Sequence, residues 1–189
     1  MGVAYTPPSR DFMRELQLLR RDVEALKRMP SGAASIATTF LAPVPAGRLY
    51  RDAAQSIPTT TPTAIEYTQE YFDSWGMHDT TGNRWRVVAP ISGWYMCGAV
   101  SGLAASAGGS IRELYLQKNL DATFGANRPA ESSALPSATV QARLSVNTVV
   151  QLTAGDWMSA VINQNSGGAL LTENITQIRD EFWMIWLGN

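Results

Sequence analysis

The sequence predicts a mainly β protein, built as a sandwich or a barrel and preceded by one short N-terminal helix. Three observations support this prediction. An apolar stripe with helical spacing lies within residues 9–29. From Arg48 onward, short apolar segments alternate with clusters of turn-forming residues, which is typical of all-β domains. Two of these segments are apolar on both faces, so a second surface is expected to cover them.

The composition suits one sizeable globular domain with an appendage. The chain has 189 residues, of which 45% are hydrophobic, so it can bury a core. The formal net charge is −1, which offers no strong field to hold nucleic acid or an anionic membrane. No run approaches the roughly 20 apolar residues needed to span a bilayer, and residues 1–10 lack a signal-peptide core. We therefore expect no nucleic-acid partner and no membrane insertion.

Cys97 is the single cysteine, so an intrachain disulfide is impossible. It lies in an apolar run, which favours a small buried side chain over a reactive thiol. The absence of disulfides fits folding in a reducing cytosol.

Residues 9–29 are predicted to form a parallel trimeric coiled coil. The acids Glu15 and Asp22 each lie five residues before a base, Arg20 and Lys27, which is the spacing of ion pairs between parallel helices. A single amphipathic helix packed on its own domain is the alternative. The stripe spans about three heptads and is marginal alone, so it needs a larger trimerising domain beside it. The predicted coiled-coil core residues are Phe12, Leu16, Leu19, Val23 and Leu26.

Residues 30–46 are predicted to be a linker. Pro30 falls at the next apolar position of the heptad pattern and cannot continue the helix. The following residues are rich in Ala, Pro, Ser and Thr. The head domain is then expected to span residues 47–189, and residues 1–8 remain as an N-terminal peptide.

The head contains several clear strand candidates. Apolar and polar residues alternate from Val140 to Val146, which predicts a half-buried strand with one wet face. Turn clusters such as residues 79–83 and 166–168 separate the candidates. The further candidates are residues 84–88, 94–100, 111–118, 157–164 and 182–187.

Two of these strands, around Trp94 and Trp183, lack the polar alternation of a half-exposed strand. A strand in a lone antiparallel sandwich exposes one polar face, so these two need cover on their outer side. A neighbouring subunit provides that cover most simply. The alternative is that the linker or a loop of the same chain covers them.

Several short segments follow one another in a characteristic order after residue 47. The segments APISGWY (89–95) and LTAGDW (152–157) are the most specific. Their order and spacing resemble the globular head of complement subcomponent q and the tumour-necrosis-factor superfamily, in particular its bacterial and bacteriophage branch. The other segments are RLY (48–50), IP (57–58), TAIEY (63–67), YFD (71–73), GMHD (76–79), NRW (83–85), SGG (166–168) and the closing residues 182–187.

The resemblance implies a ten-stranded antiparallel jelly-roll sandwich that forms a compact homotrimer with aromatic residues along its threefold axis. We accordingly assign Tyr95, Cys97, Trp183 and Trp186 to the trimer interface. Eukaryotic members often follow a collagen stalk, but this chain has no Gly-X-Y repeat and the coiled coil stands in its place. Some relatives bind calcium near the trimer apex. No acidic loop here has EF-hand spacing, so calcium stays an open question.

The sequence contains no recognisable catalytic constellation. His78 is the only histidine, and its turn-like GMHD segment favours a structural role over a zinc ligand or a member of a catalytic triad. The chain has no G-x-S-x-G, P-loop or G-x-G-x-x-G motif. Scattered carboxylates leave a glycan hydrolase as a remote alternative. We expect no enzyme activity, no catalytic residues, no metal site and no cofactor.

A proline-containing N-terminal peptide, a short coiled coil and this kind of head resemble bacteriophage virion components. We expect a homotrimer of the tail-tip or fibre type, attached to other virion proteins through Tyr5, Pro7 and Pro8. Its head would bind a glycan or protein of the host surface. The expected location is the virion, assembled in the host cytoplasm. A capsid decoration or head fibre of the same architecture is the close alternative, and a bacterial adhesin similar to complement q is the further one.

Overall fold

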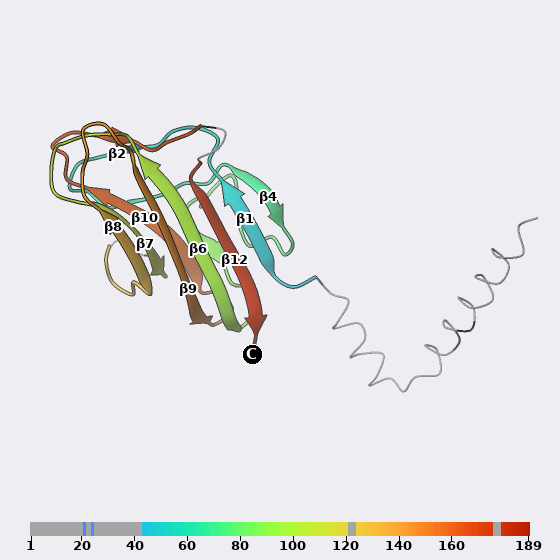
Figure 1. The fold of residues 1–189 in the computed structure, drawn as a ribbon. Coiled ribbons are helices and arrows are strands. Elements are labelled where there is room, and N and C mark those ends of the chain that lie inside the picture. Colours follow the sequence, from blue (N-terminus) through green and yellow to red (C-terminus); the bar gives the residue numbers. More distant parts are fainter. Residues whose placement is uncertain (1–20, 22–23, 25–42, 121–123, 176–178) are drawn as a thin grey trace, which may run out of the picture. The chain divides into compact units, whose positions relative to one another are not determined.

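The computed structural model describes residues 21, 24, 43–120, 124–175 and 179–189, and residues 44–189 form one compact unit (Figure 1). Arg21 and Glu24, within the predicted coiled coil, are helical and exposed. The predicted coiled-coil core and attachment residues lie outside the described residues: Phe12, Leu16, Leu19, Val23, Leu26, Tyr5, Pro7 and Pro8. No described helix is long and apolar enough to cross a bilayer.

The head consists of two antiparallel sheets. Sheet I has the order β4-β1-β12-β6-β9, and sheet II has the order β3-β10-β7-β8 with β5 added beside β10. The strands of sheet I are β4 (Gln69–Asp73), β1 (Ala46–Tyr50), β12 (Glu181–Gly188), β6 (Gly93–Leu103) and β9 (Ala142–Leu152). Those of sheet II are β3 (Thr63–Ala64), β10 (Trp157–Gln164), β7 (Arg112–Lys118), β8 (Ala130–Ala134) and β5 (Val87–Val88). A short ribbon pairs β11 (Leu170–Leu171) with β2 (Ser56–Ile57).

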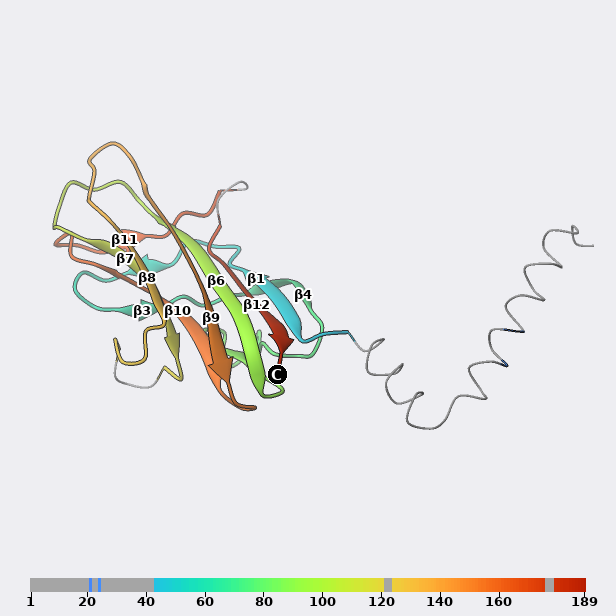
Figure 2. The ribbon, with the colours of Figure 1, turned by 60° about the horizontal axis from the view of Figure 1, so that its bottom comes forward.

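The two sheets form the layers of a sandwich, with β6, β12, β9 and β1 in one layer and β7, β8 and β10 in the other (Figures 1 and 2). Side chains alternate between the faces of a strand, so every second residue of β6 and β12 enters the space between the sheets. Tyr95, Cys97, Phe182 and Met184 are fully buried there. Sheet II supplies the opposite wall of the same core, including Leu114, Leu116, Ala160 and Ile162. The predicted antiparallel jelly-roll sandwich is thus confirmed, with two five-stranded sheets and the β11–β2 ribbon in the described residues.

Several predicted boundaries differ from the structure. In the predicted strand 84–88, only Val87 and Val88 are strand. Arg84 and Trp85 lie in a turn closed by the hydrogen bond from Arg86 N to Asn83 O (3.1 Å). The backbone amides of Gly82 and Asn83, just before this turn, donate to the Asp79 carboxylate. At the start of the head, β1 begins at Ala46, inside the predicted linker, because Ala46 pairs with Ile185 of β12.

The turn before β10 shows how the LTAGDW segment acts locally. Gly155 has φ +93°, a left-handed conformation that glycine adopts without steric cost. The carboxylate of Asp156 accepts bonds from Thr153 N and Asn119 Nδ2, both at 2.7 Å, and pairs with Lys118 Nζ at 2.8 Å. Burial alone would raise the pKa of Asp156, but these donors together lower it to about 2. Asp156 therefore ties the turn to the end of β7.

We expect Asp156→Ala to reduce the free energy of unfolding by about 2 kcal/mol at pH 7, because several charge-assisted hydrogen bonds are lost. A lowered pKa gives stability that is present above the unfolded value, about 4, and lost as pH falls toward about 2. The difference between wild type and variant should therefore shrink over that range in urea titrations. Glu131→Ala, at a side chain that is 63% exposed, is the matched control. An Asp156→Ala variant as stable as this control would contradict the prediction.

A candidate interaction face on sheet I

The outer face of sheet I, which points away from the core, is apolar at the end where β12 finishes. Strand pairing places Ile185, Met96 and Val149 side by side across β12, β6 and β9. Trp94 and Leu187 follow toward the ends of β6 and β12. Met96 is 38% exposed, and Trp94, Val149 and Leu187 are between 45% and 55% exposed. We call these five residues the apolar half of the face; Phe72 and Trp183 lie at its border, because both pair with Arg48 of β1.

Trp183 lies at the centre of the face, and a glycine makes its position possible. Gly98 of β6 pairs with Trp183 of β12, and a Cβ at Gly98 would lie 2.3 Å from the Trp183 ring. The indole therefore lies directly over the backbone of β6. Phe72, Arg48, Trp183 and Ile185 border a hollow of about 330 Å³ beside it. The absence of a side chain at Gly98 thus turns a large aromatic ring into a flat part of the surface.

The opposite end of the same face is polar. Arg48 donates from Nε (3.0 Å) and Nη2 (2.6 Å) to Glu181, and the Tyr71 hydroxyl lies 3.1 Å from the other oxygen of Glu181. Tyr50 lies against Tyr71 with ring centroids 4.5 Å apart. We call this end, which also includes Arg143, Ser145 and Arg179, the polar half. The face therefore changes from apolar to charged along the length of its strands.

The structure assigns different roles to the four residues predicted for the trimer interface. Trp183 lies on the outer face. Tyr95 and Cys97 are 0% exposed and belong to the core between the sheets, which corrects the prediction for both because a fully buried side chain cannot contact a partner. Trp186 also points inward, packs against the core and donates from Nε1 to Ser92 O (3.3 Å). Burial also raises the pKa of the Cys97 thiol to about 12, as suits an inert core cysteine.

The residues that do form the apolar half are the neighbours of those predicted. Trp94 and Met96 alternate with Tyr95 and Cys97 along β6, and Ile185 and Leu187 alternate with Trp186 along β12. An apolar residue at every position hides which set points outward, because both sets satisfy a buried environment. The sequence offers one clue, the glycine at position 98 within the apolar run, but its pairing with Trp183 is seen only in the structure. Glycine leaves room on the face toward which the tryptophan points.

A buried acid lies behind the polar half. Asp180 is 1% exposed, and its Oδ1 accepts a 2.6 Å bond from Ser101 Oγ. Burial raises the pKa of Asp180 to about 6, against the effect of that hydrogen bond. Asp180 O also accepts a bond from Arg51 N (3.0 Å). The carboxyl therefore joins β6 to the segment that leads into β12.

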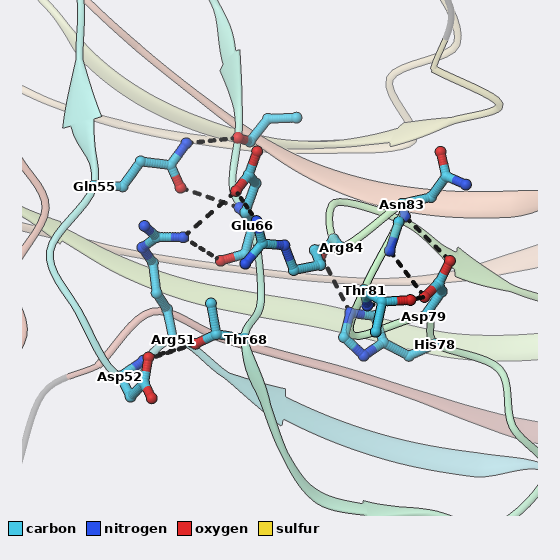
Figure 3. A network of polar contacts seen from close by, with 12 residues as sticks. Arg51, Asp52, Gln55, Glu66, Thr68, His78, Asp79, Thr81, Asn83 and Arg84 are labelled. Atoms are coloured by element: carbon cyan, nitrogen blue, oxygen red, sulfur yellow. Dashed lines mark hydrogen bonds and ion pairs between the residues drawn. The ribbon is translucent and has the colours of Figure 1, made fainter.

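The histidine and the scattered carboxylates form structural contacts. Figure 3 shows the network in which Gln55 and Arg51 contact the backbone of residues 64–66 while Asp79 caps the turn at 81–83. The His78 side chain is 0% exposed, and its ring nitrogens lie 3.1 Å from Glu70 Oε1 and 3.2 Å from Arg84 O. Among the described residues, no group of three or more His, Cys, Asp or Glu side chains is placed to hold a metal ion. This geometry fits the predicted turn-fixing role of His78.

Two antiparallel five-stranded sheets with this strand order define a jelly-roll head. No family model matches the sequence, and no curated protein matches it. Solved structures share the fold. The globular domain of zebrafish complement 1qA is 15% identical with a TM-score of 0.56, covering 78% of this chain and 100% of that one.

Two further solved structures are similar to the same extent. Murine APRIL at pH 5.0 is 10% identical with a TM-score of 0.57, covering 77% of this chain and 100% of that one. The Eiger TNF from S. frugiperda is 12% identical with a TM-score of 0.56, covering 78% and 94%. The chain therefore has the fold of complement-q and TNF heads.

Asp180→Asn is expected to change how stability depends on pH. A folded pKa near 6 means that the folded wild type keeps a proton that the unfolded chain releases near pH 4. The contribution of Asp180 to the wild-type free energy of unfolding therefore falls as pH rises from about 4 to about 6, and it is constant above that range. Between pH 4 and pH 6, the free energy of unfolding of the variant should rise relative to that of the wild type by on the order of 2 kcal/mol, as measured by urea titration.

Asp52→Asn provides the control for this experiment. Asp52 is exposed, and the hydrogen bond from Thr68 lowers its pKa, so its pH dependence has the opposite sign. An Asp180→Asn difference that stays constant from pH 4 to pH 7 would contradict the assignment of a protonated Asp180.

Proposed function

We propose that this protein is a non-enzymatic homotrimeric binding head whose subunits associate through the apolar half of sheet I. The observation that supports this most strongly is the row formed by half-buried Ile185 and exposed Met96 and Val149, with exposed Trp94 and Leu187 beside it. Monomeric soluble proteins rarely expose a contiguous apolar patch of this kind. No described part of the same chain covers these side chains, so a second subunit is the simplest cover.

The number three comes from the fold rather than from the face itself. The head has the fold of complement-q and TNF heads, and the resemblance to that family implies a compact trimer. The predicted coiled coil at residues 9–29 adds a parallel arrangement of the chains, because its acids and bases suit pairs between parallel helices. Both features favour a closed, symmetric assembly with all heads on one side.

The purified chain should sediment as a trimer at micromolar concentration, and Met96→Asp should dissociate the heads into monomers. A carboxylate in the middle of the apolar half would be desolvated without a partner, which strongly disfavours association. Leu171→Asp, at a 54% exposed leucine in β11 outside both sheets, is the control and should stay trimeric. Sedimentation velocity and circular dichroism together separate dissociation from unfolding. A wild-type monomer with folded secondary structure would refute the proposal.

We further propose that the trimer is a bacteriophage virion protein of the tail-tip or fibre type, attached through residues 1–8 and projecting its head toward the host surface. The support is the succession of a proline-containing peptide, a short coiled coil and a jelly-roll head in one small chain. A distal binding head on a stalk suits contact with a host-surface glycan or protein. A capsid decoration of the same architecture would differ only in where the peptide docks.

Antibodies raised against residues 44–189 should label the tail tip of intact particles in negative-stain electron microscopy. The reason is that the head projects while residues 1–8 dock, so the head epitopes stay exposed. Pre-immune serum on the same particles is the control. Labelling of the capsid instead of the tail tip would contradict the tail-tip role and indicate a capsid decoration protein. Unlabelled particles would reject a virion role and favour the adhesin.

A further inference from the structure

The polar half of sheet I contains a hollow of about 540 Å³ with an unusual set of charges. Three arginines from three different segments line it: Arg48 of β1, Arg143 of β9 and Arg179 just before β12. Glu181 is the acidic residue among its lining, and Trp183 forms its apolar wall. All of these groups belong to one chain, so the hollow is complete in a single subunit.

The three arginines differ in how far their charge is already balanced. Arg48 is paired with Glu181 at 2.6 Å. Arg143 has a looser pair, with its Nε 3.6 Å from Glu173 Oε2, and its side chain is 58% exposed. Arg179 has no carboxylate within ion-pair distance in the described part of the chain; its guanidinium carbon lies 5.0 Å from the centroid of the Tyr50 ring. Once the two pairs are counted, one positive charge remains at the hollow.

Arg179 also has an unused hydrogen-bond donor. Its Nε is buried and has no acceptor among the described residues. Because this Nε has almost no exposed surface, a ligand in the hollow would contact the other nitrogens of the Arg179 guanidinium. Guanidinium groups bind carboxylates through two parallel N–H···O bonds. The unbalanced charge at the hollow therefore belongs to the Arg179 side chain.

We propose that this hollow binds a carboxylate-bearing sugar, with the carboxylate on Arg179 and Arg143 and the sugar ring against Trp183. One net positive charge matches a singly charged carboxylate better than a doubly charged phosphate. The flat indole held over Gly98 gives an apolar surface for the C–H face of the sugar. Ser145 adds a hydroxyl that can both donate and accept.

This inference names the ligand class for the proposed host-binding head, and it rests on that function only for the position of the site. The apolar and polar halves lie at opposite ends of the same strands. Association through Trp94, Met96 and Leu187 therefore leaves the arginine end of the face accessible. Because the hollow is complete in one chain, sugar binding and trimer formation can be measured and can fail separately.

The test is titration of the full chain with sodium D-glucuronate, followed by ligand-observed NMR and by tryptophan fluorescence. D-glucose and inorganic sulfate are titrated in parallel. We expect glucuronate to bind, glucose to bind at least tenfold more weakly, and sulfate to compete only weakly. Arg179→Gln should weaken glucuronate binding at least tenfold, and Arg179→Lys should restore part of it because the charge remains while the two-pronged geometry is lost.

Arg86→Gln is the matched control, because Arg86 also lies against aromatic rings, 5.4 Å from that of Trp157, but directly precedes β5 of sheet II. It should bind glucuronate like wild type. Equal binding of glucuronate and glucose, tighter binding of sulfate, or unchanged binding by Arg179→Gln would each overturn the inference. Sedimentation of the same samples reports the oligomeric state. A wild-type trimer that binds no glucuronate would refute the sugar-binding site and leave the trimer proposal standing. A monomer that binds glucuronate would refute the trimer proposal and leave the site standing.

Discussion

The register of β6 between β12 and β9 is the constraint on which the other features of the head depend. This register directs Tyr95 and Cys97 into the core and Trp94 and Met96 onto the outer face. A shift of one residue would exchange these two sets completely. The exchange would bring Gly98 inward and remove the surface on which Trp183 lies. The apolar half, the polar half and the buried core are therefore set by one pairing pattern.

Much of the fold could be predicted from the sequence, because strand and turn signals in this chain are local. The long strands β6, β7, β10 and β12 and the turn at Asp156 follow from runs of apolar residues and from turn-forming clusters. The short strands β2, β3 and β11 have two residues each and no pattern to read. Their existence depends on partners far away in the sequence.

The sequence predicted which two strands contribute to the outer face, but not which of their side chains point outward. The segments around Trp94 and Trp183 are apolar on both sides; one side of each lies in the core, and cover on the other side stays a prediction. Which side is which depends on the pairing across strands, and the sequence does not show pairing. For the same reason, the sequence could not predict that the arginines of the polar half lie together. Arg48, Arg143 and Arg179 are far apart in the chain, and only the sheet brings them together.

The position of β12 in sheet I has a consequence for how the head is made. β12 is formed from residues 181–188, yet it lies in the middle of the sheet, between β1 and β6. Until these residues leave the ribosome, the strand pairs β4–β1 and β6–β9 have no shared edge. Contacts between such distant segments form slowly. The emerging chain thus holds the outer face of sheet I in two unjoined pieces until synthesis of this domain is complete.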